Sequence, residues 1–140
     1  MMDRAGAVAN AALLVYAAGH LDAFLEMITD DITYALYVDQ DVLPFAGETQ
    51  GKAAFRERIA QMQYSFEYVL YRPLGVRAVG YVAHTQVEFM YRHRASQEIL
   101  SGRFRLVLTV RGDLISRIEE YHDAERVKAF IRLVGGVEPE

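Results

Sequence analysis

The clearest pattern in the chain is the alternation of apolar and polar residues between Gly102 and Asp123. Over Arg103–Arg111 apolar side chains occupy every second position, which is the period of a half-buried β-strand. Gly112 supplies the permissive backbone of a hairpin turn, and Leu114–His122 reads as the return strand. Strict alternation gives the return strand one face with Ile115, Arg117, Glu119, Tyr121 and Asp123, and another with Leu114, Ser116, Ile118, Glu120 and His122. Both faces carry charge, so at least one of them faces something other than a dry core.

The hairpin register is open at this point. A two-residue turn pairs Leu108 with Arg117 or Ile115, whereas a three-residue turn pairs Arg105 with Glu119. The register decides which face of the first strand joins a pocket.

The rest of the pattern predicts helices first and strands afterwards. The predicted helices are Asp3–Ala18, a stripe from Leu21 to Ile28 that Asp30-Asp31 breaks, Lys52–Gln63 and a terminal helix Asp123–Val134. The further predicted strands are Ile32–Val38, Ser65–Tyr71, Val76–Arg94 with a break near Val79-Gly80, and Ile99–Arg111. Proline and glycine predict a loop over Asp39–Gly51. This order predicts one α+β domain spanning residues 1–140.

Within the long strand region, Tyr81–His93 alternates well, as in an antiparallel sheet with one covered face. The predicted covered face holds Tyr81, Ala83, Thr85, Val87, Phe89 and Tyr91; the opposite face holds Val82, His84, Gln86, Glu88, Met90 and Arg92. That opposite face is polar enough for solvent but contains Val82 and Met90. It therefore predicts a homodimer through a wet, two-fold contact between sheets.

Composition narrows the function classes. The 140 residues are 52% hydrophobic and 24% charged, as in an ordinary globular domain, and the net charge of −4 gives no reason to expect nucleic acid or a membrane as partner. The chain has no cysteine, which excludes disulfides and thiolate chemistry. Ala7–Ala18 could pass for a signal-peptide core, but Met-Met-Asp-Arg before it has no net positive charge and Asn10 interrupts it. We therefore expect a cytoplasmic protein.

The order of elements resembles the cystatin-like, nuclear-transport-factor-two-like superfamily, and within it the SnoaL-like polyketide cyclases and ketosteroid isomerases. The residues that carry the resemblance are Ala18–Asp22, Thr29–Thr33, Gly47 and Gly51 beside the third helix, and the final strand Gly112–Asp123. The resemblance covers nearly the whole chain. It implies a curved antiparallel sheet, wrapped by three N-terminal helices into a cone with a closed apolar pocket, a short C-terminal helix, and usually a dimer.

The site residues depart from one branch of that family. In ketosteroid isomerases the general base is an aspartate that aligns with Leu36, and the oxyanion-donating tyrosine aligns with Ala12. These differences argue against steroid isomerisation by that mechanism. In the polyketide cyclases an acid/base aspartate ends the last strand, and it matches Asp123. By the resemblance, the strand face with Arg117, Glu119 and Tyr121 lines the cone.

The four candidate catalytic residues are therefore Asp123, Glu119, Arg117 and Tyr121. A carboxyl group in an apolar pocket can remove a proton beside a carbonyl, and Arg117 or Tyr121 could hold the developing oxyanion. Each residue also has a purely structural interpretation. Asp123 precedes a helix and is a good N-cap, Glu119 could pair with Arg105 across strands, Arg117 could be a surface charge, and Tyr121 a half-buried strand residue.

The aromatic residues are first of all core, and a subset of apolar residues is expected to line a ligand pocket: Tyr34, Leu36, Phe55, Phe89 and Phe104. The histidines lack metal-ligand spacing, and the proposed chemistry needs no cofactor. His122 points away from Asp123, which makes it a poor catalytic partner by this interpretation. Two functions stay open: a cofactor-independent cyclase or isomerase acting on a hydrophobic carbonyl compound, or a non-catalytic binding or dimerising module.

Overall fold

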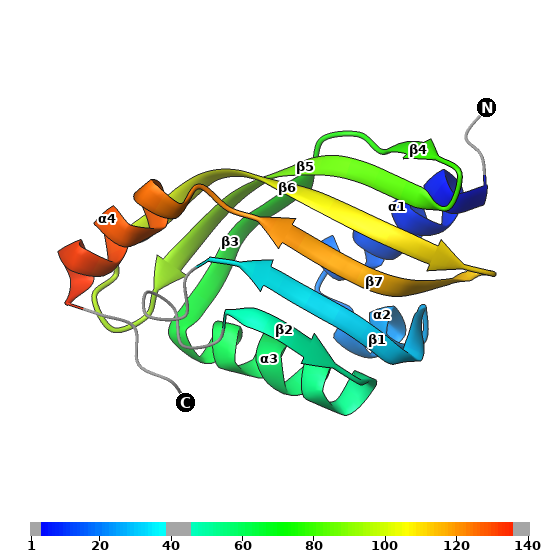
Figure 1. Ribbon diagram of the computed structural model, residues 1–140. Helices are drawn as coiled ribbons and strands as arrows, with labels where there is room; N and C mark the ends of the chain where they lie inside the picture. Colours follow the sequence, from blue (N-terminus) through cyan, green and yellow to red (C-terminus); the bar gives the residue numbers. More distant parts are fainter. Residues whose placement is uncertain (1–3, 39–45, 136–140) are drawn as a thin grey trace.

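A single curved sheet forms the centre of the molecule, with helices packed against it (Figure 1). The computed structural model describes residues 4–38 and 46–135. The helices are α1 (Arg4–Ala17), α2 (Leu21–Leu25), α3 (Lys52–Ser65) and α4 (Ala124–Val134). The strands are β1 (Ile28–Tyr37), β2 (Gly47–Gln50), β3 (Phe66–Pro73), β4 (Arg77–Val79), β5 (Val82–His93), β6 (Ile99–Arg111) and β7 (Leu114–Tyr121).

The strands lie in the order β2-β1-β7-β6-β5-β3, with β4 paired to β5. All pairs are antiparallel except β1 and β7, which run parallel and are far apart in the chain, as a parallel pair requires because a hairpin cannot join it. The predicted α+β class with a curved sheet is confirmed, with this one parallel pair added. No helix in the described ranges is long and apolar enough to cross a bilayer.

The core lies between the sheet and helices α1–α3. Its fully buried members include Ile32 and Phe55, and α3 contributes Ile59 and Met62 to the same cluster. We call the sheet face toward this core the inner face and the opposite one the outer face. The predicted alternation of β5 is confirmed for Ala83 to Tyr91, but Tyr81 is 77% exposed because it lies in the turn before the strand.

The largest error in the predicted elements is at the start of β1. The helical stripe ends at Leu25 rather than Ile28, and the strand includes Asp30 and Asp31 instead of beginning after them. The pairing of β1 with β7 is irregular between Ile28 and Thr33, and the two aspartates are exposed there.

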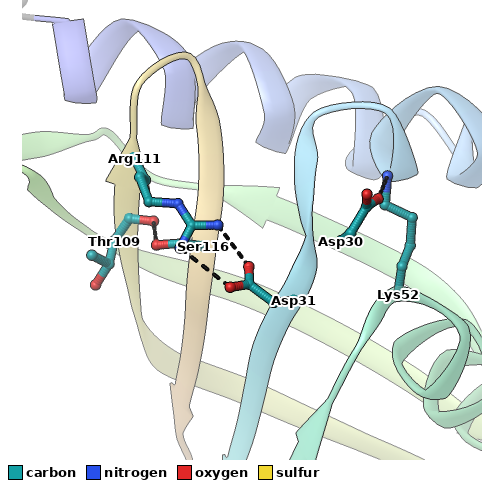
Figure 2. A network of polar contacts seen from close by, with 6 residues as sticks. All are labelled: Asp30, Asp31, Lys52, Thr109, Arg111 and Ser116. Carbon is teal, nitrogen blue, oxygen red and sulfur yellow. Dashed lines mark hydrogen bonds and ion pairs between the residues drawn. The ribbon is translucent and has the colours of Figure 1, made fainter.

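Figure 2 shows that these two aspartates point to different neighbours. Asp31 Oδ1 accepts a hydrogen bond of 2.7 Å from Arg111 at the end of β6, which lowers the pKa of Asp31. Asp30 Oδ1 lies 3.5 Å from Lys52 Nζ at the start of α3. The irregular segment is thus held by surface ion pairs to β6 and α3. Gly47–Gln50, predicted as loop, is the short edge strand β2; residues 39–45 of that predicted loop lie outside the described ranges.

Candidate active site

A β-bulge at Ser116 decides which side chains of β7 face the core. Val110 pairs with Ile115 and Thr109 pairs with Arg117, so Ser116 is one extra residue in β7. Beyond the bulge, Leu108 pairs with Ile118. The turn has two residues, Gly112 and Asp113, but the bulge shifts the register away from all of the predicted pairings. Past this point, strict alternation from Ile115 assigns each side chain to the wrong face.

The bulge therefore corrects the predicted position of the candidate catalytic face. Arg117, Glu119 and Tyr121 lie on the outer face and line neither of the cavities in the core. Asp123 is exposed, and its Oδ1 accepts a 3.2 Å hydrogen bond from the backbone N–H of Arg126. It caps α4, as one of the two interpretations predicted. A catalytic role for these four residues stays a prediction that their positions do not favour.

The outer-face residues do form a local network. The Tyr121 hydroxyl donates to Glu119 Oε2 at 2.8 Å, and Arg117 Nε lies 3.5 Å from Glu119 Oε1. Arg105 lies over the Tyr121 ring at 4.4 Å from its centroid, so it is not the predicted ion-pair partner of Glu119. These contacts account for the charged residues of the outer face, which interact with one another at the protein surface.

The carboxylate that does reach the interior is Glu120. It is 7% exposed, and it is the only buried acidic residue in the described part of the chain. Tyr34 donates its hydroxyl to Glu120 Oε2 at 2.8 Å, and His122 Nε2 lies 3.0 Å from Glu120 Oε1. Both carboxyl oxygens thus have a polar partner, which is what a buried carboxylate requires. His122 also stacks on Phe104, with ring centroids 4.5 Å apart.

The parallel pairing of β1 with β7 brings these groups together. Tyr34 pairs with Ile118 and Leu36 pairs with Glu120, so Tyr34 and Glu120 are diagonal neighbours on the inner face. Leu36, the position that aligns with the isomerase base, is therefore directly beside Glu120. The interior therefore does contain a carboxylate, on β7, one strand away from the β1 position that aligns with the isomerase base.

Two small cavities lie near this carboxylate: Glu120 itself lines the first, and its neighbour His122 lines the second. The first has about 20 Å³ and the second about 30 Å³. The first is lined by Leu13, Tyr16, Phe24, Tyr34, Phe55, Ile59, Tyr71, Leu106, Leu108, Ile118 and Glu120. The second is lined by Leu36, Met62, Phe66, Tyr68, Phe89, Tyr91, Leu100, His122 and Val127.

Of the predicted pocket residues, Tyr34 and Phe55 line the first cavity, and Leu36 and Phe89 line the second. Phe104 is buried behind them, in contact with the rings of Tyr71, Phe89 and His122. Whether these residues bind a ligand stays a prediction.

Most of the other polar groups that line the two cavities are tyrosine hydroxyls. Burial raises the pKa of Tyr34, Tyr16 and Tyr71 well above the usual value of 10.0, and the negative charge of Glu120 raises each further. These hydroxyls therefore stay protonated and act as hydrogen-bond donors. Tyr16 donates to the Tyr68 hydroxyl at 3.4 Å, whereas the Tyr71 hydroxyl forms no hydrogen bond within the described ranges. The described residues contain no group of three or more histidine or acidic side chains placed to hold a metal ion.

Comparison with known proteins identifies the family. The family model described as the SnoaL-like domain matches residues 9–118. The chain belongs to the SnoaL-like domain family. No curated protein matches it. In this SnoaL-like domain Glu120 and His122 lie just beyond the matched segment, so the family match by itself does not point to them.

Solved structures show the same fold at low sequence identity. A candidate polyketide cyclase from Xanthomonas campestris pv. campestris is 19% identical with a TM-score of 0.77, over 90% of this chain and 95% of that one. An NTF2-like protein of unknown function from Burkholderia pseudomallei is 13% identical with a TM-score of 0.81, over 95% and 98%. TerC, co-crystallised with polyporic acid, is 14% identical with a TM-score of 0.78, over 96% and 100%.

Sequence reasoning missed Glu120, His122 and the tyrosines of α1 and β3. A signal for Glu120 was present: it shares a face with Ile118, and a carboxylate between apolar neighbours on a buried face is uncommon. The bulge hid this signal, because alternation counted from Ile115 gives the wrong face.

Proposed function

We propose that this SnoaL-like domain is a cofactor-independent acid/base enzyme of the cyclase or isomerase type, acting on a hydrophobic carbonyl compound. The observation that carries the proposal is the buried Glu120, held between Tyr34 and His122 at the wall of an otherwise apolar and aromatic cavity. Burying a carboxylate costs free energy, and nothing in the packing of the sheet requires one here. We assign the group to proton transfer.

In the proposed reaction, Glu120 removes a proton from the carbon beside the substrate carbonyl, and the bond electrons move to the carbonyl oxygen to give an enolate. Tyr71 is the proposed donor to that oxygen, because its side chain lines the same cavity and its hydroxyl has no hydrogen-bond partner among the described residues. When the substrate is a β,γ-unsaturated carbonyl compound, the enolate is conjugated with the double bond, and Glu120 then returns the proton at the γ carbon, which is isomerisation. Alternatively, the enolate carbon attacks a second carbonyl of the same molecule and the new alkoxide takes the proton, which is cyclisation.

Tyr34 and His122 have positioning roles in this scheme. Tyr34 holds Glu120 Oε2 by a hydrogen bond of 2.8 Å, which leaves the carboxylate little freedom to rotate. His122 Nε2 lies 3.0 Å from Oε1, and its ring is held in place by stacking on Phe104. Two relatives of the same fold carry names that suit this chemistry, a candidate polyketide cyclase and a candidate isomerase from Rhodopseudomonas palustris. At their low identity they support the fold and suggest the reaction type.

The two adjacent glutamates offer a matched pair of variants. The test is α-proton exchange of 2-tetralone, a neutral ketone, in D₂O followed by NMR. We expect the wild-type protein to accelerate exchange, and Glu120→Gln to lower that acceleration by about 10²- to 10⁴-fold, the usual contribution of a general acid or base. Glu119→Gln, one residue away on the outer face, should leave it unchanged. Equal loss in both variants, or exchange that survives Glu120→Gln, would contradict the assignment.

A second function is a non-catalytic small-molecule binding module of the same fold. Its support is that both oxygens of Glu120 already have protein partners, as in a purely structural network. Binding of 2-tetralone by the wild-type protein, without any acceleration of exchange, would favour this function.

A further inference from the structure

The interior cavities are too small for any substrate of the proposed kind. They measure about 20 and 30 Å³, whereas an apolar cavity of about 150 Å³ is needed to hold benzene. Each has room for little more than a water molecule. If the proposed function is right, some side chains must move before a ligand reaches Glu120, and the structure should indicate which ones.

A surface groove of about 330 Å³ lies on the other side of three tyrosines. It is lined by Tyr16, Ala17, Ala18, Gly19, Leu21, Gln63, Tyr68, Val69 and Tyr71. Tyr16 and Tyr71 also line the cavity that contains Glu120, and Tyr68 also lines the second cavity. These three side chains are therefore the wall between the groove and both cavities.

The contacts that hold the three tyrosines of the wall in place are weak enough to break and re-form. The Tyr16–Tyr68 hydrogen bond, at 3.4 Å, is long, and the Tyr16 ring meets Tyr71 edge to face at 5.0 Å. All three side chains are only partly buried. The opposite side of the groove consists of the small residues that end α1, and the space beside Gly19 is open, with no atom within 4 Å of where a Cβ would be. Turning the three rings toward the groove would join the cavities to it.

The groove carries no charged side chain among its nine described lining residues; Gln63 and the three hydroxyls are its polar groups. Beyond the wall, the acidic Glu120 lines the first cavity and His122 lines the second, and these two side chains lie 3.0 Å apart. An anion that followed this route would leave water without meeting an arginine or lysine, which is costly. A neutral ring system with a carbonyl or hydroxyl oxygen has no charge to desolvate, so its entry does not carry this free-energy cost.

We propose that the groove between the end of α1 and strand β3 is the mouth of the Glu120 site, closed by Tyr16, Tyr68 and Tyr71, and that it admits neutral aromatic carbonyl compounds and rejects carboxylates. The inference rests on the proposed function, since it names the route and the substrate class of the same site.

The test compares two ligands of nearly the same shape, neutral 2-acetonaphthone and anionic 2-naphthoate, by calorimetry and stopped-flow fluorescence at pH 7. The wild-type protein should bind 2-acetonaphthone at least tenfold more tightly. Gln63→Lys places a cation in the groove and should reduce that preference at least fivefold, whereas Gln50→Lys, at an exposed position of the edge strand β2, should not change it. Ala18→Trp fills the groove at an exposed position and should slow association of 2-acetonaphthone at least tenfold.

Equal affinity for the two ligands, no binding of either, or equal effects of Gln63→Lys and Gln50→Lys would overturn the proposal, as would an unchanged association rate in Ala18→Trp. Thermal unfolding of each variant checks that it is folded. The two proposals fail separately. Selective binding without Glu120-dependent proton exchange leaves the groove as the mouth of a binding site, and exchange that depends on Glu120 but ignores Gln63→Lys places the mouth elsewhere.

Discussion

Removing the Tyr34 hydroxyl tests whether the buried carboxylate is held as the geometry indicates. Tyr34→Phe keeps the ring, which packs edge to face against Phe55 at 5.2 Å, and deletes the hydroxyl that donates to Glu120 Oε2 at 2.8 Å and contacts Met62 Sδ at 3.6 Å. A hydrogen bond to a charged group contributes about 1.5–3 kcal/mol, and Glu120 is too deeply buried for water to replace the lost donor fully. We expect the free energy of unfolding to fall by about 2 kcal/mol, which lowers Tm by roughly 8 °C in a domain of this size.

A double-mutant cycle separates this interaction from other effects of the substitution. Glu120→Leu removes the carboxylate, so Tyr34→Phe in that background removes a hydroxyl whose remaining acceptor is the weak one, Met62 Sδ at 3.6 Å. The second substitution should then cost less than about 0.5 kcal/mol, giving a coupling free energy of about 1.5 kcal/mol between the two side chains. The assay is urea unfolding followed by circular dichroism. Additive costs, or a cost of Tyr34→Phe near zero in the wild-type background, would refute the description of Glu120 as a carboxylate held by Tyr34.

Three further predictions concern the cap, the tyrosines and the assembly. Asp123→Ala should lower the free energy of unfolding by about 1 kcal/mol through the lost N-cap, and Asp123→Asn should restore most of it, as urea unfolding will show. The pKa values of Tyr16, Tyr34, Tyr71 and Tyr91 are raised in the fold, so the unfolded state ionises first and stability should fall as pH rises above about 10; phenolate absorbance should appear together with the loss of circular dichroism. The expected homodimer through the outer face should sediment as a dimer at micromolar concentration, and a monomer mass would exclude it.

The helices and strands predicted best from the sequence are those whose alternation of apolar and polar residues is uninterrupted. Strand β6 has the predicted bounds Ile99–Arg111, and α3 starts at Lys52 as predicted, because in both cases the local pattern and the tertiary packing agree. The start of β1 was wrong for the opposite reason. Ile28 continues a helical stripe in the sequence, but its side chain is buried in the sheet, opposite Ile115, and tertiary packing overrides the local preference.

The candidate site was predictable in its apolar part and not in its polar part. Four predicted pocket residues line the two cavities: Tyr34, Leu36 and Phe89 from the inner face of the curved sheet, whose bulky side chains must fill its hollow, and Phe55 from α3, which packs against that face. The two predicted acids, Asp123 and Glu119, line neither cavity, whereas the buried carboxylate is Glu120, because no local rule signals a bulge at a serine. Tyr16, Tyr68 and Tyr71 come from α1 and β3, so their meeting depends on tertiary contacts that the sequence pattern does not encode.

The bulge at Ser116 also affects how this strand is compared with those of its relatives. A β-strand presents its two faces in a fixed phase, and an inserted residue reverses that phase for every position after it. Two family members that differ by this one insertion carry the same residue letters on opposite sides of the sheet. An acidic residue aligned by column is then functionally equivalent only if the phase also matches. When the catalytic residues of a relative are assigned to the last strand of this fold, the comparison should therefore use the sheet face on which each residue lies after the bulge. An acidic residue one position away in the alignment can be the true counterpart.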